Sequence, residues 1–315
     1  MNAATAFAPA TVANVAVGFD ILGFAIEGVG DVVTVSKIER DTVLISEIVV
    51  NTGSLSDLEL PSDPKQNAAT AGLTKLRADL KLEFGFEVSL RKGIWIGSGM
   101  GGSAASAVGA LVAANELLPN RLSNAQLLKY ALVGEKAASG SAQADNIAPC
   151  LFGGLTLVIA TDPVRVVPIP VPKEILTVLV HPRHRVETRR ARDILKPDVP
   201  LADHVRQSAH LGGLIAGCYS KDLDLIKESF RDLLIEPQRA ALIPALAEVK
   251  DAALRNGALG ASISGSGPSV FAWVTSPETA SKVRDAMLRA YRTKGVTEVD
   301  SWISPVSTQG ARIIA

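Results

Sequence analysis

The stretch that decides the fold of this 315-residue chain reads Gly97-Ser98-Gly99-Met100-Gly101-Gly102-Ser103-Ala104-Ala105-Ser106. A strand-like segment, 86–96, precedes it, and an alanine-rich segment with helical character, 107–118, follows at once. In such a turn the bare backbone N–H groups can approach an anion, and the dipole of the following helix favours negative charge. The stretch therefore predicts a phosphate-binding loop at the start of a helix.

Two familiar phosphate motifs do not fit this loop. A Walker loop closes on Gly-Lys-Ser or Gly-Lys-Thr, and no lysine lies between Gly93 and Leu118. A dinucleotide-binding fingerprint needs an acidic residue about 20 residues further on, but Glu116 comes earlier and falls inside the expected helix. The residues of the loop alone leave one other interpretation open, a turn whose small side chains merely let the helix pack tightly.

The composition indicates a globular protein without a bulk charge for nucleic acid or membranes. Hydrophobic residues make up 47% of the chain, so a sizeable core is expected. At this length the chain can form one large domain or two ordinary ones. The 32 Lys and Arg residues balance the 32 Asp and Glu residues, and a neutral chain has no general attraction to nucleic acid or to anionic lipid.

Location is predicted from what the chain lacks. The N-terminal residues 1–9 have neither a basic segment nor an apolar segment of a secretory signal. No run of about 18 apolar residues is present to form a transmembrane helix. Cys150 and Cys218 are far apart and do not have the spacing of a metal site, so we interpret them as buried thiols in a reducing compartment. A cytoplasmic protein is expected.

Strand-like and helix-like segments mix without a regular βαβ repeat, which predicts an α+β fold. Strands are expected at 32–37, 42–50, 84–90, 153–160 and 176–181, in the glycine-rich region 260–274, and as a final pair within 299–314. Helices are expected at 67–80, 103–118, 123–137, 205–217, 223–234, 243–256 and 277–294, with Ser123 as an N-cap. The four prolines in 163–172 favour an extended crossing, so we predict domains at 1–163 and 164–315.

Two more segments rich in small residues accompany the loop. The segment 7–23 joins a strand-like start to a polar pair, Asn14 and Asp20. Asn and Asp next to glycine are also common in plain turns. The segment 261–269 is a second glycine-serine loop within an apolar region. Three such loops spread along one chain are what a buried pocket for nucleotide and substrate requires.

In this order, the three segments resemble the GHMP kinase superfamily, and within it the homoserine kinases. The first resembles the motif Pro-Ala-Thr-x-Ala-Asn-x-x-x-Gly-Phe-Asp-x-Leu-Gly, the second the loop Gly-Leu-Gly-Ser-Ser-Ala-Ala, and the third a C-terminal Gly-x-Gly-Pro loop. The resemblance implies a two-domain fold, with an S5-like N-terminal domain that binds ATP and a ferredoxin-like C-terminal domain. It also implies ATP-dependent phosphorylation of the L-homoserine hydroxyl, a step of threonine biosynthesis.

Four further segments are similar to this family. They are Glu135 with Gln143-Ala144-Asp145-Asn146-Ile147-Ala148-Pro149, the pair Thr188 and Arg192, the single residue His210 at a substrate-facing position, and Asp232 with Glu236-Pro237-Gln238-Arg239.

The resemblance implies ATP and Mg²⁺ as cofactors. Mg²⁺ prefers oxygen ligands, usually one or two from the protein with phosphates and water completing the set, and the resemblance assigns these to the hydroxyl of Ser103 and the carboxylate of Glu135. The implied nucleotide-binding residues are Asn67, Gly97, Ser98, Gly99, Met100, Gly101, Gly102, Ser103, Ala104, Ser106, Gly265 and Gly267.

The implied substrate is a small zwitterion. Its carboxylate calls for arginine, whose planar fork suits bidentate pairing, and its ammonium and hydroxyl call for carboxylate and amide partners. The implied substrate-binding residues are Asn14, Asp20, Gln143, Asp145, Arg192, His210 and Arg239.

Asn146 and Thr188 are the implied catalytic residues. Mevalonate-kinase-like relatives place an aspartate at the position of Asn146 as a general base, and an amide cannot take a proton from a hydroxyl. The implied mechanism is a direct attack of the substrate hydroxyl on the γ-phosphate. Its proton then passes to the phosphate or to water, and the rate comes from orientation and electrostatics.

The sequence departs from the family at three positions. Gln143 stands where the family usually has histidine, Gly102 replaces the first serine of the Ser-Ser pair, and Trp95 replaces a proline before the loop. Activity is expected, with an altered affinity for homoserine. Three alternatives stay open: another small-molecule GHMP kinase, a non-catalytic binding member, and a nucleic-acid-binding protein, which the neutral charge and the 4% aromatic content oppose. The hydrophobic C-terminal half favours a homodimer.

Overall fold

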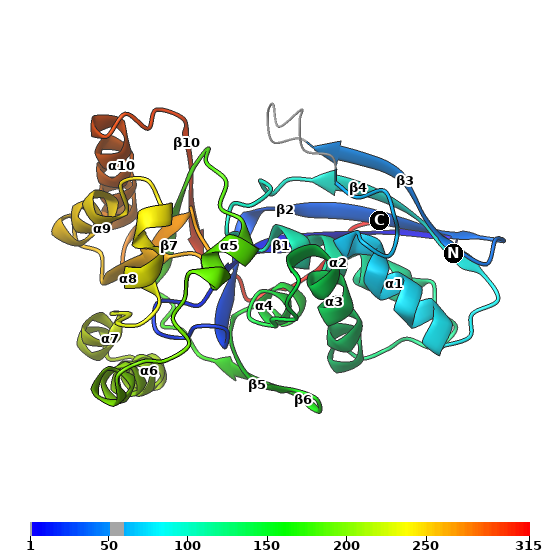
Figure 1. Cartoon of the computed structure of the whole chain (residues 1–315), viewed down its shortest axis with the longest axis horizontal. Coiled ribbons are helices and arrows are strands. Elements are labelled where there is room, and N and C mark those ends of the chain that lie inside the picture. The colour runs from blue at the N-terminus through cyan, green and yellow to red at the C-terminus, as the bar shows by residue number, and fades with distance from the viewer. Residues whose placement is uncertain (1, 51–59) are drawn as a thin grey trace.

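The computed structural model of the chain describes residues 2–50 and 60–315. Two β-sheets form its framework, one at each end of an elongated molecule, each with its own helices (Figure 1). This is the predicted α+β architecture. Within the described residues, no helix is both long enough and apolar enough to cross a membrane.

The larger sheet has seven strands in the described part of the chain and belongs to the N-terminal half. Its main path runs β11-β1-β2-β4-β3, and β5 and β6 extend it from β2. The strands are β1 (Ala3–Ala13), β2 (Leu22–Ile38), β3 (Val43–Val50), β4 (Gly85–Lys92), β5 (Leu155–Thr161), β6 (Val164–Ile169) and β11 (Arg312–Ile313).

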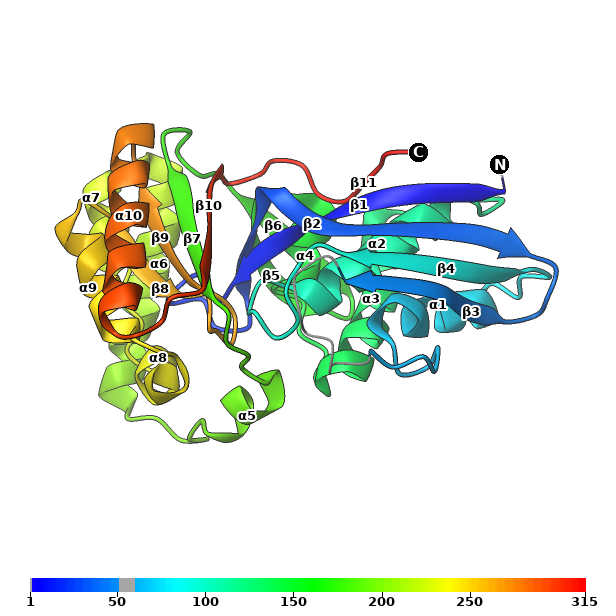
Figure 2. The same cartoon turned by 90° about the horizontal axis from the view of Figure 1, so that it is seen from above.

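Four helices pack on this sheet. They lie on one side of its strands (Figures 1 and 2). Their bounds are α1 (Ala68–Asp79), α2 (Gly102–Glu116), α3 (Asn124–Ser139) and α4 (Ile147–Phe152). Alanines and glycines let α2 lie close to the strands, and a Cβ on Gly109 would be only 2.8 Å from Val33. Ser123 is the N-cap of α3, as predicted, and Gln126 completes a capping box with it.

The smaller sheet is antiparallel, with the order β10-β7-β9-β8. Its strands are β7 (Leu176–Pro182), β8 (Gly260–Ile263), β9 (Val270–Val274) and β10 (Val299–Pro305). Its helices are α5 (Thr188–Asp193), α6 (Leu201–Ser220), α7 (Leu223–Ser229), α8 (Glu236–Arg239), α9 (Leu246–Arg255) and α10 (Pro277–Thr293). A short 3₁₀ turn, Ala240–Leu242, follows α8.

Aromatic side chains join the two halves. Phe24 of β2 packs edge-on against Phe271 of β9, with 5.6 Å between ring centroids, and lies 5.7 Å from Trp273. These three rings are fully buried within one continuous cluster. A second cluster, around Val178, lies between the smaller sheet and α9 and α10. The shared cluster holds the two sheets together at the level of the site.

Several predicted elements differ in the structure. The final strand pair is wrong, because β10 pairs with β7 and β11 pairs with β1 in the other sheet. Helix α7 ends at Ser229, and α9 begins only at Leu246, after Pro244. The short helix α4 was not predicted. Cys150 and Cys218 are free and buried, as expected.

The division into two domains stays a proposal. Strand β6, which begins at the predicted boundary, pairs with β5 of the larger sheet. The C-terminal strand β11 also returns to that sheet. The pairing favours a boundary after Ile169, a few residues beyond the predicted one, with the last residues of the chain assigned to the first domain.

Candidate active site

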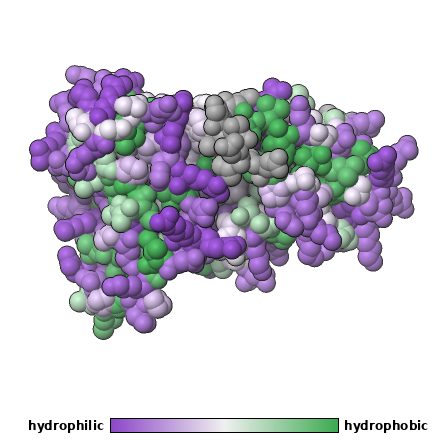
Figure 3. All heavy atoms as spheres, turned by 45° about the horizontal axis from the view of Figure 1, so that its top comes forward, coloured by the Kyte–Doolittle hydropathy of each residue, from purple (hydrophilic) through white to green (hydrophobic). Residues whose placement is uncertain are grey.

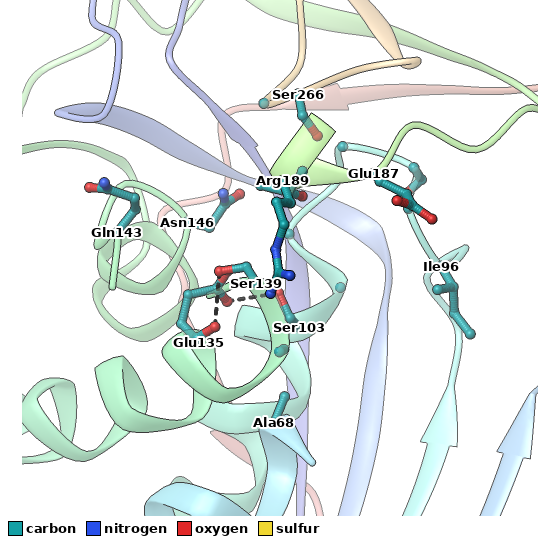
Figure 4. Close-up of a pocket in the computed structure, with 18 of the residues that line it drawn as sticks. Ala68, Ile96, Ser103, Glu135, Ser139, Gln143, Asn146, Glu187, Arg189 and Ser266 are labelled. Carbon is teal, nitrogen blue, oxygen red and sulfur yellow. Dashed lines mark hydrogen bonds between the residues drawn. The ribbon is translucent and has the colours of Figure 1, made fainter. Parts of the chain in front are cut away.

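One cavity of about 500 Å³ lies where loops of both halves meet (Figure 4). Its walls come from the β1–β2 loop, the glycine-rich loop before α2, the end of α3, the segment from β7 to α5, and the β8–β9 loop. The predicted site residues that line it are Asn14, Asp20, Asn67, Gly97, Ser98, Gly99, Gly101, Gly102, Ser103, Ser106, Glu135, Gln143, Asp145, Asn146, Thr188, Arg192, Arg239 and Gly265.

Four predicted residues do not line the cavity. Met100 and Ala104 are fully buried in the core beside it. Gly267 lies behind Gly265, where a Cβ would meet the side chain of Ile243. His210 lies on α6, and its Nδ1 is 2.9 Å from the carbonyl oxygen of Arg231. The structure therefore does not bring His210 to the cavity.

The glycine-rich loop leaves backbone N–H groups free at the start of α2. Gly97, Gly99 and Gly101 all have φ between +68° and +76°, which only glycine adopts readily. A Cβ on Gly99 would be 2.3 Å from the carbonyl oxygen of Ser264. Helix α2 has no side-chain cap, and its intrahelical bonds begin at the N–H of Ala105. Within the described residues, the N–H groups of 102–104 have no protein acceptor, as an anion site requires.

A buried ion pair supports this helix start from below. Lys92 of β4 contacts Asp31 of β2, and its Nζ also donates to the carbonyl of Gly102 at 2.8 Å and to Ser106 Oγ at 2.9 Å. Asp31 accepts the backbone N–H groups that follow Lys92. A Cβ on Gly102 would lie 3.3 Å from Ile94 and 3.4 Å from Lys92 Nζ. Glycine at this position thus avoids a tight contact with Ile94 and Lys92.

Ser103 and Glu135 form an oxygen-rich corner beside the loop. Ser103 Oγ donates to Glu135 Oε2 at 2.7 Å (Figure 4). Burial raises the pKa of Glu135, and hydrogen bonds from Ser103 and Ser139 oppose that rise. No group of three or more acidic, histidine or cysteine side chains that could hold a metal occurs in the described residues. A hydroxyl and one carboxylate suit a Mg²⁺ ion that also binds phosphates and water.

The same cavity also carries a charged cluster. Arg192 of α5 forms a two-pronged ion pair with Asp20, with N–O distances of 2.9 and 3.0 Å. Arg239 is 3% exposed, and it donates to the carbonyl oxygens of Ala191 and Gly265. Both guanidinium groups lie over the ring of Phe19, at 5.5 and 5.1 Å from its centroid. Both signs of charge are thus fixed at one end of the cavity.

The β1–β2 loop that carries Asp20 has an unusual backbone. Asn14, Val15, Ala16 and Asp20 all have positive φ, which is costly for residues other than glycine, and most of all for a β-branched one such as Val15. The Asn14 side chain stabilises the turn, since its Nδ2 donates to Gly265 at 2.7 Å and its Oδ1 accepts from the N–H of Asp20. Asn14 therefore positions the charged cluster, with both ends of its amide used by the protein.

Asp145 and Asn146 line the same cavity. Burial and the charges of Asp20 and Glu135 raise the pKa of Asp145 to about 7. Asn146 Oδ1 accepts a hydrogen bond from Thr11 Oγ1 at 2.7 Å. This bond leaves Asn146 Nδ2 as a donor toward the cavity.

The cavity also contains residues that sequence reasoning missed. Lys92, Arg185 and Arg189 bring cationic side chains to it, and an apolar wall is formed by Leu60, Pro61, Ala68, Leu90, Trp95 and Ile96. Neither Arg185 nor Arg189 is one of the residues that the resemblance to the family singles out. For Lys92, the only signal in the sequence is the alternating pattern of β4, which places this charged side chain on the buried face of the strand. Predicted Asn67 caps α1, and its side chain bonds Ala69 and Pro61.

Family models match two segments of the chain. Residues 67–154 match the GHMP kinases N-terminal domain, and residues 214–293 match the GHMP kinases C-terminal domain. The fold and the glycine-rich loop before α2 thus define a GHMP kinase, a small-molecule phosphotransferase that uses ATP.

Relatives that match the full length of the chain identify its family within this class. The chain is 47% identical over 315 residues to a homoserine kinase of Xanthomonas campestris pv. campestris, covering 100% of this chain and 95% of the relative. It is 42% identical to that of Chloroherpeton thalassium over the whole of both chains. The crystal structure of homoserine kinase from Cytophaga hutchinsonii superposes with a TM-score of 0.94 at 42% identity, covering 100% and 98% of the two chains. The chain belongs to the homoserine kinase family.

Proposed function

We propose that this protein transfers the γ-phosphoryl group of ATP to the side-chain hydroxyl of L-homoserine, giving O-phospho-L-homoserine for threonine biosynthesis. One observation carries this proposal. The anion-binding start of α2 and the paired charges of Asp20, Arg192 and Arg239 line the same cavity. A triphosphate suits the first end, and a small zwitterion suits the second.

The nucleotide is assigned to the side of the cavity that includes the glycine-rich loop. The free N–H groups of 102–104 bind the phosphates, and the α2 dipole favours their charge. The apolar wall that includes Leu90 and Ile96 offers a surface for the purine. Asn67 holds this wall in place, because it ties the start of α1 to Pro61.

Mg²⁺ is assigned to Ser103 and Glu135. The fit rests on a buried carboxylate whose nearest donor is a hydroxyl, in a corner open to the phosphates. When bound there, the ion neutralises charge on the phosphate oxygens. Glu135 would hold the ion as a carboxylate, and the charge of a bound cation would lower the pKa that burial raises.

Homoserine is assigned to the charged end. Arg192 and Arg239 bind its carboxylate, and Asp20 and Asp145 bind its ammonium group. Gln143 contributes an uncharged amide to the lining of the same cavity. When homoserine binds, Asp20 and Arg192 give up their mutual hydrogen bonds, and each contacts one charged end of the zwitterion instead.

Catalysis is assigned to orientation by Asn146 and Thr188. Asn146 Nδ2 donates to the substrate hydroxyl oxygen and holds it in line with the γ-phosphate, while Thr11 fixes the amide from behind. Thr188, at the first residue of α5, lines the same region. The hydroxyl proton passes to the phosphate or to water, and no side chain acts as a base.

Assembly and location are part of the proposal. We assign a homodimer in the cytoplasm. Exposed apolar side chains of α6, among them Leu201, Val205 and Tyr219, offer a surface for a second copy. Figure 3 shows hydrophobic atoms gathered toward the lower left of the molecule, the end that carries α6 and α7 in Figure 1.

A coupled ADP-release assay with homoserine, mevalonate, shikimate and galactose tests the substrate. ADP release should depend on homoserine, with the other three compounds at background. Turnover of a different alcohol would identify another small-molecule kinase of this class. Silence on all four, together with ATP binding by calorimetry, would favour a non-catalytic binding protein.

A further inference from the structure

Arg189 of α5 lines the cavity on the phosphate side. Its side chain extends from the helix toward Ser103 and Ser139 (Figure 4). The position of a Cβ on Gly140 would be 3.3 Å from one of its terminal nitrogens, so the guanidinium rests on the turn that ends α3. The charge of Arg189 therefore lies beside the corner formed by Ser103 and Glu135.

The other cations of the cavity already have partners. Lys92 contacts Asp31, Arg185 lies 3.7 Å from Glu187, Arg192 pairs with Asp20, and Arg239 bonds two carbonyls. Among residues 2–50 and 60–315, Arg189 has neither an ion pair nor a hydrogen bond to protein. A guanidinium offers five donors in a planar fork that matches phosphate oxygens.

We propose that Arg189 is a further catalytic residue, whose guanidinium binds oxygens of the terminal phosphates of the nucleotide. This inference rests on the proposed phosphoryl transfer. In that step the substrate oxygen forms a bond to the γ-phosphorus, and the bond from that phosphorus to the β–γ bridging oxygen breaks. The electron pair stays on ADP, and the hydroxyl proton passes to phosphate or water. Arg189 keeps its proton and neutralises the charge that develops on the phosphate oxygens.

The positive charge of Arg189 comes from the second half of the molecule. The glycine-rich loop belongs to the helices of the larger sheet, whereas Arg189 follows β7 of the smaller sheet. Thr188 and Arg192, on the same short helix, face the hydroxyl and the substrate carboxylate in the proposed function. One segment, 188–192, thereby contacts both reactants and couples their alignment.

The test compares Arg189→Ala and Arg189→Lys with Arg190→Ala. Arg190 is the matched control, because it is the next residue on α5, is also exposed, and lines a different, smaller cavity. Steady-state kinetics give kcat and the KM of each substrate, and calorimetry gives the Kd of ATP and of AMP. Thermal melting checks that each variant is folded.

Removal of a single transition-state donor typically costs on the order of 100-fold in kcat. Arg189→Ala is therefore expected to lower kcat/KM for ATP by about 100-fold and to weaken ATP binding, with AMP binding unchanged. Arg189→Lys is expected to recover part of the loss, because it keeps the charge without the fork. Arg190→Ala should behave as wild type.

Equal kcat/KM for Arg189→Ala and Arg190→Ala would overturn the inference. So would an equal loss of ATP and AMP affinity, which would indicate a general effect on the cavity. If the wild-type protein does not phosphorylate homoserine, the proposed function fails separately. The ATP and AMP affinities of the same variants then still decide whether Arg189 binds the terminal phosphates.

Discussion

Arg192 and Asp20 hold each other in a two-pronged ion pair at the substrate end of the cavity, with N–O distances of 2.9 and 3.0 Å. Both side chains are partly exposed to the cavity. Asp20 sits on a strained loop of the first half, and Arg192 on a helix of the second. The pair therefore links the two halves where the zwitterion is proposed to bind. It also fixes both charges before the substrate binds.

Arg192→Ala and Asp20→Ala are each expected to raise the KM for homoserine by roughly 10- to 150-fold, since each loses a charged hydrogen bond worth about 1.5–3 kcal/mol. The KM for ATP should change little. Because each single variant also leaves its partner unpaired, the double variant should lose less than the two single effects combined. If the effects of the two substitutions were strictly additive, or if they acted mainly on the KM for ATP, the pair would not belong to the substrate site.

Asp145 predicts a pH dependence for substrate capture. Its pKa of about 7 in the free protein means that it is protonated at pH 6 and ionised at pH 8. Only the ionised form attracts the ammonium group, so kcat/KM for homoserine should fall about tenfold per pH unit below that pKa. In the complex the ammonium lowers the pKa, so kcat should lack this limb. Asp145→Asn should abolish the limb in a full pH profile, and a limb that survives in that variant would assign it to another group.

Asn146 tests the mechanism without a base. Asn146→Ala should lower kcat at least 100-fold, because the hydroxyl is no longer held in line with the phosphate. Thr11→Val, which removes the bond to Asn146 Oδ1 and nearly keeps the side-chain shape, should lower kcat to a smaller extent. A basic limb in the kcat–pH profile that one side-chain substitution removes would contradict the mechanism.

Glu135 tests the metal assignment. Glu135→Gln keeps the shape and the hydrogen bond to Ser103 but loses the negative charge. The Mg²⁺ concentration needed for half-maximal activity should therefore rise at least tenfold, while ATP affinity measured without metal should not fall. The matched control is Glu187→Gln, which removes a carboxylate from the same cavity at an exposed position. An equal metal requirement in both variants would exclude Glu135 as a ligand.

The buried Lys92–Asp31 pair is expected to support both stability and nucleotide binding. Removing one partner of such a pair typically costs about 3–5 kcal/mol, because a charge is left buried without compensation. Lys92→Met and Asp31→Asn should each lower the free energy of unfolding by that order in denaturant titrations. The double variant should recover part of the loss. Single variants as stable as wild type would show that the pair does not anchor the start of α2.

Much of the fold follows from local sequence patterns. The glycine-rich loop, the Ser123 cap and the helix over 277–294 depend on residues close in the chain, and the structure confirms them. The pairing of β10 with β7, and of β11 with β1, depends on contacts between distant segments. Nothing in residues 299–314 encodes which sheet each strand joins, and so the predicted pair was wrong.

The site was predictable where residues match a family motif. Asp20, Arg192, Ser103 and Glu135 matched family motifs, and the structure brings them to one cavity. Arg189 could not be separated by sequence from Arg190, because only the direction of α5 decides which of the two faces the cavity.

Two further positions also could not be interpreted correctly from the sequence alone. The resemblance alone suggested a substrate-facing role for His210, but its ring bonds the backbone carbonyl of Arg231 and does not line the cavity. Gly102 departs from the family, and the limited space beside it, against Ile94 and Lys92, appears only in three dimensions.

The central claim is that one cavity joins ATP to homoserine for direct phosphoryl transfer. The most direct measurement follows ³¹P resonances while the purified protein acts on ATP, Mg²⁺ and homoserine. One phosphate monoester of homoserine should form for each ADP, and no ADP should form without homoserine. ADP accompanied only by inorganic phosphate, or ADP formation that ignores homoserine, would contradict it.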